Sequence, residues 1–325
     1  MEWDTAIERF LQQRTGVITD DSVALYRREL ATWTRWRESH DCRSPLELIT
    51  LDELDRFFYY LANEHIPHRH NPSRPAAPKT GLSPETVAAY RRVLRAFWRF
   101  SDARRWLSDD QRGFFGREGV RIARVPEVAR PVYEESQFSE MLTACGDGQT
   151  EESARDRTLL SLLWQSGARI TEILSIDDER LDLKRKRARI VGKGKIERMV
   201  RWAAIAQSEL LRYLQLRRGT SGGPLFRASG PLAGEATRLT TNVARSRFKR
   251  IMEAADIDLV DGSPLHAFRR SFIQRGIDDG MDISDVSQLA GHRNIETTMR
   301  YARRNEEKLQ EIYESGYVRR ERRKK

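Results

Sequence analysis

The residue types in this chain that could do chemistry are cations, imidazoles and a phenol, most of them in its last third. They are Arg169, Lys193, His266, Arg269, His292 and Tyr301. The sequence around them holds no cluster of carboxylates of the kind that binds a catalytic Mg²⁺. Such a set suits attack by a tyrosine on a phosphodiester, with protein cations in place of a metal ion.

Phosphodiester chemistry explains why these residue types are needed. Attack at phosphorus gathers negative charge on the non-bridging oxygens, and the planar fork of an arginine matches two such oxygens. Arginines and imidazole donors that are fixed in advance stabilise that charge. Tyrosine, with an unperturbed pKa of about 10, is a poor nucleophile at neutral pH and needs a nearby cation or base. A lysine with a lowered pKa can return a proton to the departing sugar oxygen.

Three sequence blocks carry a resemblance to a known family. The blocks span 162–177, 189–198 and 266–301. The first contains an arginine after Ser-Gly-Ala, the second a lysine at a glycine-rich turn, and the third the two histidines, the second arginine and the tyrosine. In these blocks and their spacing the chain resembles the tyrosine recombinases, the phage-integrase and Xer-like site-specific recombinases. The resemblance covers most of residues 130–305.

The resemblance implies which residues hold the scissile phosphate. Arg169 and Arg269 would clamp the phosphate, and His292 would donate a hydrogen bond to it. Glu172, one helical turn after Arg169, would support the site. The resemblance implies neither a metal ion nor a nucleotide cofactor, because a covalent link to the protein preserves the bond energy for rejoining.

The resemblance also implies the proton transfers and the nucleophile. Tyr301 would form a 3′-phosphotyrosyl link to DNA, and His266 would act as general base or as an orienting donor. Lys193 would be the general acid for the leaving hydroxyl. Lys195 is a rival for that role, and the spacing favours Lys193.

Each residue also has an ordinary structural interpretation when it is taken alone. A single arginine is usually a solvated charge, Lys193 could be a turn residue, His266 could belong to the first turn of a helix, and Tyr301 could be a core aromatic. Their joint order and spacing favour the active site. Three other functions stay open at this point: a type IB topoisomerase-like enzyme that relaxes DNA, a DNA-binding protein without catalysis, and a metal-dependent nuclease.

Composition agrees with a nucleic-acid partner. The formal net charge is +10, from 58 Lys and Arg against 48 Asp and Glu, and a basic excess supplies the salt-sensitive part of DNA binding. Cys42 and Cys145 lie far apart without metal-ligand spacing, as expected for free thiols in the cytoplasm. We expect neither a signal peptide nor a membrane span.

The chain is predicted to be a mainly α two-domain protein. We expect a small all-helical DNA core-binding domain over 1–115, a basic interdomain linker over 116–131, a catalytic domain over 132–318 and a basic tail over 319–325. The catalytic domain is predicted to be α+β, mostly helical with a small antiparallel sheet from strands over 187–191 and 197–202.

A repeated pattern in the first domain predicts its DNA-binding face. The segment 23–36 aligns with 87–100, and both have apolar residues at helical spacing. Basic residues follow the opposite face of the second copy without interleaved acids, so we expect them to contact DNA phosphates. The predicted DNA-contact residues of the two copies are Arg27, Arg28, Arg91, Arg92, Arg95 and Arg99. The proline-rich loop 65–79 holds three histidines without a fourth ligand, so we expect no metal site there.

The end of the chain suggests a separable nucleophile segment and an assembly device. A helix is expected over 295–302, after a helix-ending glycine at 291, so Tyr301 would lie on a short segment of its own. A further helix is expected over 305–318. The family resemblance implies a homo-tetramer on double-stranded DNA with paired half-sites, in which this last helix docks either on a neighbouring protomer or on its own core.

Overall fold

The computed structural model describes residues 2–42, 44–67, 80–116, 119–120, 132–192, 197–217, 222–228, 237–258, 264–292, 294–299, 301 and 313. The chain divides into two compact units, Met1–Val128 and Ala129–Lys325. The expected linker over 116–131 and helix over 305–318 lie almost entirely outside the described residues, and the expected tail over 319–325 lies wholly outside them. Within the described residues, no helix is long and apolar enough to cross a membrane.

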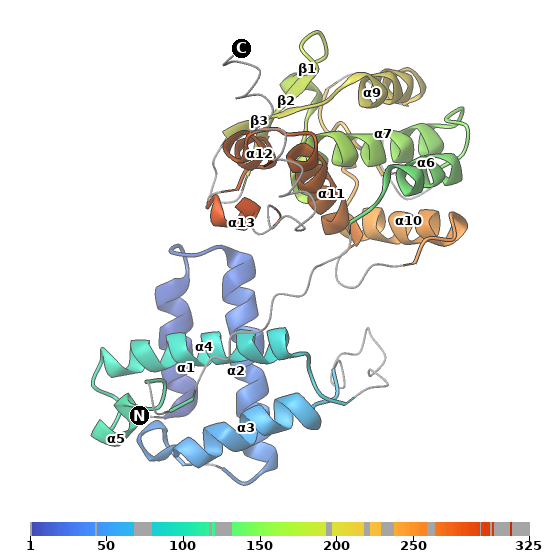
Figure 1. Ribbon diagram of the computed structural model, residues 1–325. Coiled ribbons are helices and arrows are strands. Elements are labelled where there is room, and N and C mark those ends of the chain that lie inside the picture. Colours follow the sequence, from blue (N-terminus) through green and yellow to red (C-terminus); the bar gives the residue numbers. More distant parts are fainter. Residues whose placement is uncertain are drawn as a thin grey trace. The chain divides into compact units, whose positions relative to one another are not determined.

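The Met1–Val128 unit is helical, as expected from the sequence (Figure 1). Its elements are α1 (Trp3–Arg14), α2 (Asp20–Ser39), the 3₁₀ turn η1 (Leu46–Leu48), α3 (Leu51–Asn63), α4 (Pro84–Asp102) and the short α5 (Asp109–Arg112). Side-chain oxygens of Thr19, Thr50 and Ser83 accept from backbone N–H groups in the first turns of α2, α3 and α4, which fixes where these helices begin. The α4 helix packs against α1, α2 and α3.

The core of this unit is rich in aromatic side chains. Trp33, Phe57 and Phe97 are fully buried, and the ring centroids of Trp33 and Phe57 lie 4.7 Å apart in an edge-to-face arrangement. Such a pair contributes about 1 kcal/mol beyond its burial. The two helices of the repeated sequence, α2 and α4, pack against each other, and apolar side chains of both contribute to this core.

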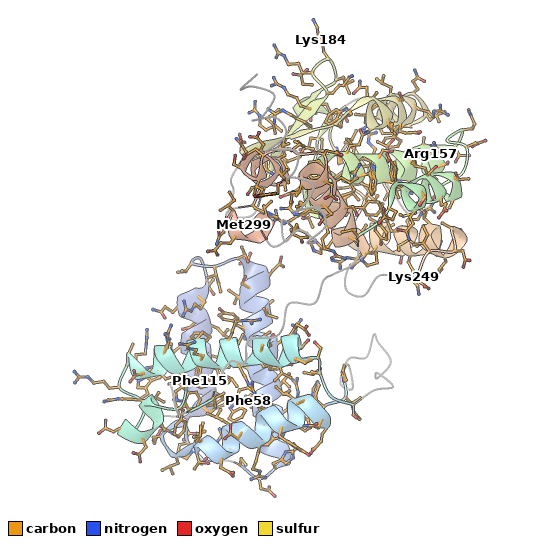
Figure 2. All side chains as sticks on the ribbon, viewed as in Figure 1. Phe58, Phe115, Arg157, Lys184, Lys249 and Met299 are labelled. Atoms are coloured by element: carbon orange, nitrogen blue, oxygen red, sulfur yellow. The ribbon has the colours of Figure 1, made fainter. Side chains whose placement is uncertain are left out.

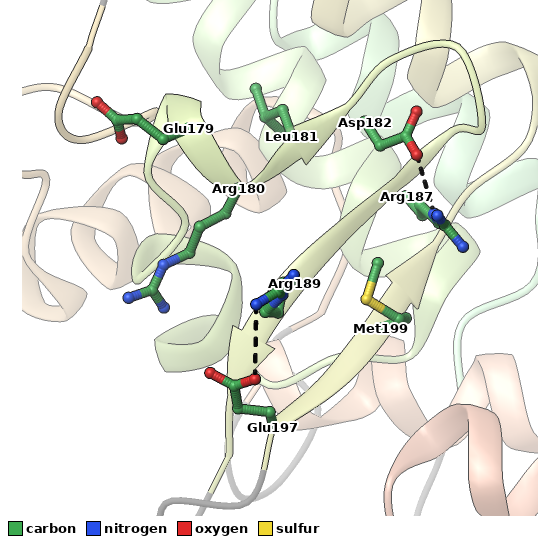
Figure 3. A pocket seen from close by; sticks show the side chains of 8 residues that line it. All are labelled: Glu179, Arg180, Leu181, Asp182, Arg187, Arg189, Glu197 and Met199. Carbon is green, nitrogen blue, oxygen red and sulfur yellow. Dashed lines mark hydrogen bonds and ion pairs between the residues drawn. The ribbon is translucent and has the colours of Figure 1, made fainter.

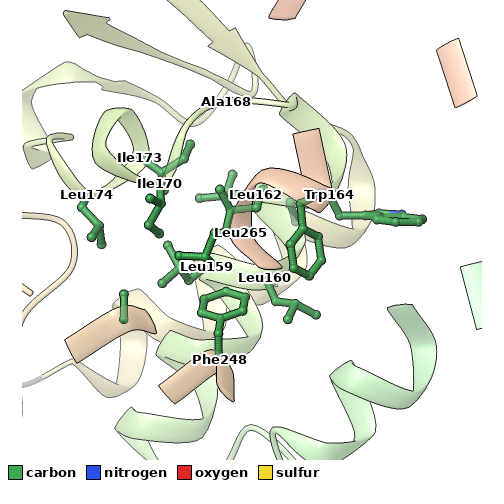
Figure 4. Close-up of a cluster of buried hydrophobic side chains, with 14 of the residues drawn as sticks. Leu159, Leu160, Leu162, Trp164, Ala168, Ile170, Ile173, Leu174, Phe248 and Leu265 are labelled. Carbon is green, nitrogen blue, oxygen red and sulfur yellow. The ribbon is translucent and has the colours of Figure 1, made fainter. Parts of the chain in front are cut away.

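The Ala129–Lys325 unit is built from helices around α7, with a small sheet at one side (Figure 1). Its helices are α6 (Glu135–Ala144), α7 (Glu151–Ser166), α8 (Ile170–Leu174), the 3₁₀ turn η2 (Asp178–Arg180), α9 (Ala204–Leu216), α10 (Thr241–Ala254), α11 (Pro264–Asp278), α12 (Ile283–Ala290) and α13 (Glu296–Met299). The α7 helix lies at the centre: most of its residues from 154 onward are buried, and it packs against α6, α8, α9 and α11. Figure 4 shows Leu159, Leu160 and Leu162 of this helix beside Phe248 and Leu265.

The sheet is antiparallel with strand order β1 (Leu181–Asp182), β2 (Arg187–Val191) and β3 (Glu197–Arg201). The predicted sheet is confirmed, but β1 was not expected, because two residues are too short to show alternation. Ile190 lies opposite Arg198 in the register and is fully buried, so Arg198 lies on the core-facing side of the sheet.

A smaller cluster at the end of the unit holds the tyrosine segment. It consists of Ile273 and Ile277 of α11 with Val286 and Ala290 of α12, and Tyr301 packs against it. The expected helix over 295–302 was too long: α13 ends at Met299, and the Tyr301 N–H donates to the Thr298 carbonyl oxygen (3.0 Å) in a tighter turn.

Candidate active site

Arg169 stands at the start of a helix, where a glycine has just ended the previous one. Gly167 has a left-handed φ of 59°, and a Cβ built on it would lie 2.3 Å from the Phe272 ring, so the turn requires glycine. Arg169 then caps α8: its backbone N–H donates to Glu172 Oε2 (2.8 Å), and its Nη1 donates to Glu172 Oε1 (2.9 Å). The Arg169 side chain stays about one-third exposed and can still reach a ligand.

Glu172 is a buried carboxylate that two arginines share. Besides Arg169, it accepts a hydrogen bond from Nη2 of Arg198 on β3 (2.8 Å). Burial alone would raise the pKa of Glu172, but hydrogen bonds and charge from Arg169 and Arg198 outweigh burial and lower it. Glu172 is therefore ionised at neutral pH and fixes both guanidinium groups, which agrees with the supporting role that we expect for it.

Arg198 is a site residue that the sequence analysis missed. Its Nη1 donates to the carbonyl oxygen of Leu289 near the end of α12 (2.7 Å), so it joins β3 to α8 and to the turn before His292. A Cβ on Gly291 would lie 2.5 Å from Arg198 Nε, so this guanidinium requires glycine at the turn. A signal existed in the sequence: alternation along β3 places this arginine on the same face as the buried Val200.

Arg269 is buried in α11 and is held by backbone carbonyl oxygens. Its Nη1 donates to Gly167 (2.9 Å) and to Ala290, while its Nη2 is buried without a hydrogen-bond partner among the described residues. Burial and then the charge of Arg169 lower the pKa of Arg269 to about 10, which still leaves it charged at neutral pH. A buried guanidinium nitrogen without a partner is costly unless a ligand satisfies it, and an anionic oxygen is such a ligand.

His266 lies one turn before Arg269 on α11, on an exposed part of the helix. Partial desolvation by the surrounding protein, followed by the charges of Arg269 and Arg169, lowers its pKa. The ring is therefore neutral near pH 7, in the form that can accept a proton.

His292 follows the left-handed Gly291 that ends α12. Its backbone N–H donates to the Ser287 carbonyl oxygen (2.9 Å), and its Nδ1 lies 2.7 Å from Oγ1 of Thr298. Burial and the charges of Arg269 and Arg169 lower the pKa of His292 to about 4. It is thus a neutral imidazole beside the arginine pair.

Tyr301 is half-buried beside these cations. The Arg269 guanidinium interacts electrostatically with Tyr301, as it does with Arg169, Glu172 and Arg198. The structure therefore brings together five of the seven catalytic residues expected from the sequence around Arg269. These are Arg169, Glu172, Arg269, His292 and Tyr301. His266 is electrostatically coupled to the same two arginines.

The lysine that we expect to act as general acid lies outside the described residues. Both Lys193 and its rival Lys195 fall in the turn between β2 and β3. The two strands that carry this turn are described, and β3 also carries Arg198, which binds Glu172.

The arginines expected to contact DNA lie on α2 and α4. Arg27, Arg28, Arg92 and Arg99 are exposed, whereas Arg91 and Arg95 are half-buried. Arg27 forms an exposed ion pair with Glu8 (2.8 Å), and the Arg91 guanidinium lies over the ring of Phe58, which Figure 2 labels.

Glu29 connects the arginines of the two helices. Its side chain is buried, and burial raises its pKa to about 7 against the opposing charges of Arg28 and Arg92. Arg28 of α2 and Arg92 of α4 thus lie around the same carboxylate, which supports a shared basic surface.

A hollow of about 370 Å³ on the outer face of the sheet is separate from the candidate site (Figure 3). Two of its three arginines pair within it, Arg187 with Asp182 (3.1 Å) and Arg189 with Glu197 (3.9 Å). None of the expected site residues lines it, so it does not bear on the chemistry.

Comparison with known proteins gives one consistent family. The model of the phage integrase family matches residues 131–308. The tyrosine recombinase XerD of Caulobacter vibrioides is 30% identical over 73% of this chain and 76% of its own, and that of Xanthomonas axonopodis is 27% identical over 97% and 98%. The Tn1549 transposon integrase, solved in complex with a circular intermediate DNA, has a TM-score of 0.71 at 15% identity and covers 95% of this chain and 98% of its own.

Proposed function

The chain belongs to the phage integrase family and is a tyrosine-type site-specific DNA recombinase, and we propose that Tyr301 is the nucleophile of its strand cleavage. The relatives are named as recombinases, which favours recombination over the relaxation of DNA by a type IB topoisomerase-like enzyme. What carries the proposal is Arg269: its buried Nη2 has no partner among the described residues, and Arg269 interacts electrostatically with both Arg169 and Tyr301.

Cleavage in this proposal exchanges one phosphodiester bond for another. The Tyr301 oxygen attacks the phosphorus, a bond from phosphorus to tyrosine forms, and the bond to the 5′ oxygen breaks. Arg169, Arg269 and His292 stabilise the charge that builds on the non-bridging oxygens. The DNA strand is then joined to the protein through its 3′ phosphate.

Proton transfer completes the step. His266, whose pKa is lowered by its surroundings and by the nearby arginines, accepts the phenol proton or orients the phosphate. Lys193 donates a proton to the departing 5′ oxygen. Rejoining is the reverse reaction, with a 5′-hydroxyl as nucleophile, so neither a metal ion nor ATP has to supply energy.

The assembly that we propose is the one that the family resemblance implies. We propose that the enzyme acts in the cytoplasm on double-stranded DNA with paired half-sites, as a homo-tetramer that exchanges strands between two duplexes. The Met1–Val128 unit would hold the duplex through the exposed arginines of α2 and α4. The segment 305–318 would link protomers or dock on its own core.

The test is covalent trapping on a nicked suicide substrate. The wild-type protein should give a slower-migrating protein–DNA conjugate on a denaturing gel, and Tyr301→Phe should give none while DNA binding is retained. Tyr59→Phe, which removes the phenol hydroxyl of an exposed tyrosine on α3, is the matched control and should still form the conjugate. A conjugate formed by Tyr301→Phe would rule out Tyr301 as the nucleophile.

A further inference from the structure

Thr298 is a fully buried polar side chain that connects His292 with the segment ending at Tyr301. Its Oγ1 lies 2.7 Å from His292 Nδ1, and its carbonyl oxygen accepts from the backbone N–H of Tyr301 (3.0 Å). Apolar side chains near it are turned outward: Ile295, just before α13, and Met299, at its end, are exposed, and Figure 2 labels Met299. The one side chain that α13 buries completely is thus a threonine, in contact with an imidazole.

Burial makes this hydroxyl contact obligatory. A buried hydroxyl without a hydrogen bond is destabilising, whereas an apolar side chain of the same shape leaves no polar group unsatisfied. The four residues of α13 are too few for a stable helix on their own. The contact between Thr298 and His292 therefore also fastens α13, and with it the backbone that leads to Tyr301.

The direction of this hydrogen bond decides what His292 can do. A neutral imidazole carries one N–H, and the partner of one ring nitrogen determines which nitrogen holds the hydrogen. Burial, with the cations Arg269, Arg169 and Arg198 around the ring, lowers the pKa of His292 to about 4, so the neutral form prevails at physiological pH. If the Thr298 hydroxyl donates to Nδ1, the hydrogen of the ring is on Nε2, and Nε2 can donate to a phosphate oxygen.

We propose that Thr298 is a positioning residue that donates its hydroxyl hydrogen to Nδ1 of His292, and so holds His292 as an Nε2–H donor for the scissile phosphate. The proposal rests on the phosphate-binding role of His292 given above. The same bond ties that donor to the Tyr301 segment, so the phosphate donor and the nucleophile are set in position together. Loss of the hydroxyl leaves Nδ1 without a partner and lets the ring hold its hydrogen on either nitrogen.

The first measurement reads the tautomer of His292 in the free protein. Nitrogen-15 NMR of histidine-labelled protein distinguishes a protonated ring nitrogen from an unprotonated one, and His292→Asn assigns the signal. We expect Nε2 protonated and Nδ1 unprotonated in the wild type and in Thr298→Ser, and a mixture of tautomers in Thr298→Val. A wild-type protein with hydrogen on Nδ1 overturns the proposal, even if Thr298→Val does not fold.

The second measurement is single-turnover cleavage of the suicide substrate. Thr298→Val, which keeps the shape and loses the hydroxyl, should cleave on the order of tenfold more slowly or worse, with an unchanged DNA dissociation constant, because a misplaced imidazole hydrogen removes a transition-state donor. Thr298→Ser should stay within about threefold of the wild type. Thr297→Val, the same change at a half-buried neighbour, is the matched control and should cleave normally.

The outcomes separate this proposal from the proposed function. Equal rates for Thr298→Val and the wild type, or equal impairment of Thr298→Ser and a folded Thr298→Val, overturn the role of the hydroxyl. Slow cleavage by Thr298→Val with an unchanged tautomer overturns the donor assignment. Absence of any conjugate with wild-type protein contradicts the proposed function instead, while the NMR result still decides the tautomer.

Discussion

The exposed arginines of α2 and α4 point to solvent, whereas two arginines of the candidate active site, Arg198 and Arg269, are held inside the protein. Arg92 and Arg99 of the Met1–Val128 unit lie on its surface. In the Ala129–Lys325 unit, Arg198 and Arg269 donate to backbone carbonyl oxygens and are largely buried. The same side chain thus appears in two environments that differ in solvation and in freedom of movement.

This contrast separates DNA binding from chemistry. Exposed cations attract DNA phosphates through a field that salt screens, and each contributes modestly. Buried cations have already lost their hydration and are fixed, so they stabilise charge on a transferring phosphate more strongly. Changes in one unit should therefore affect mainly binding, and changes in the other mainly cleavage.

Arg269→Ala should have the largest effect. It removes the buried Nη2 that we assign to the scissile phosphate, so single-turnover cleavage should fall by about 10²–10³-fold while the DNA dissociation constant changes by no more than a few-fold. Arg275→Ala is a matched control on the same helix: Arg275 donates to the Trp164 carbonyl oxygen and lies over the Trp164 ring. It should lower the melting temperature and leave cleavage nearly unchanged. Equal losses of cleavage in both variants would contradict a direct role for Arg269.

Arg198→Met should have an intermediate effect on cleavage and a clear effect on stability. The substitution removes one of the two arginines that pair with the buried Glu172 and leaves only Arg169 among the described residues. We therefore expect cleavage to be about tenfold slower. We also expect the free energy of unfolding at pH 7 to fall by roughly 3 kcal/mol. Urea unfolding and single-turnover cleavage measure the two effects. Adding Glu172→Gln should cost less than the sum of the single changes, because the two residues interact directly.

The stability effect should also depend on pH. The folded-state pKa of Glu172 is lowered, so its ion pairs stabilise the fold fully above the ordinary pKa of 4.5 and less as the pH falls through the lowered value. The difference between wild type and Arg198→Met should therefore narrow below about pH 4.5. A difference that stays constant down to pH 3 would show that lost packing, and not the ion pair, is responsible.

Arg92→Gln with Arg99→Gln should have the smallest effect. Loss of two exposed phosphate contacts should weaken binding several-fold and reduce the slope of log affinity against log salt by about 0.9 for each contact. Fluorescence anisotropy over a salt series measures this slope. Arg112→Gln removes a cation in the same unit that pairs with Asp102 and Asp109, and it should change the slope less. An unchanged slope in the double variant would remove this surface from the DNA interface.

The sequence predicted those parts of the molecule that depend on local chemistry. Capping residues and apolar periodicity located the helices, and the glycine-rich turn around Lys193, together with the family resemblance, located the hairpin. The spacing of the arginine, histidine and tyrosine motifs predicted a site that the fold brings together around Arg269. The sequence did not predict the tertiary contacts. Arg198 and Thr298 form hydrogen bonds with residues that lie elsewhere in the chain, and no local pattern indicates those partners. The end of α13 was not predicted either, because helix propensity does not indicate the tight turn in which the Tyr301 N–H donates to the Thr298 carbonyl oxygen.

The central claim is that one phenol, Tyr301, becomes linked to DNA in a site of fixed arginines. The most direct test is mass spectrometry of the conjugate trapped on a suicide substrate, after digestion of both protein and DNA. The account predicts a nucleotide attached through its 3′ phosphate to the peptide that contains Tyr301, with a free 5′-hydroxyl on the released strand. A nucleotide on any other residue, or a link through a 5′ phosphate, would contradict it.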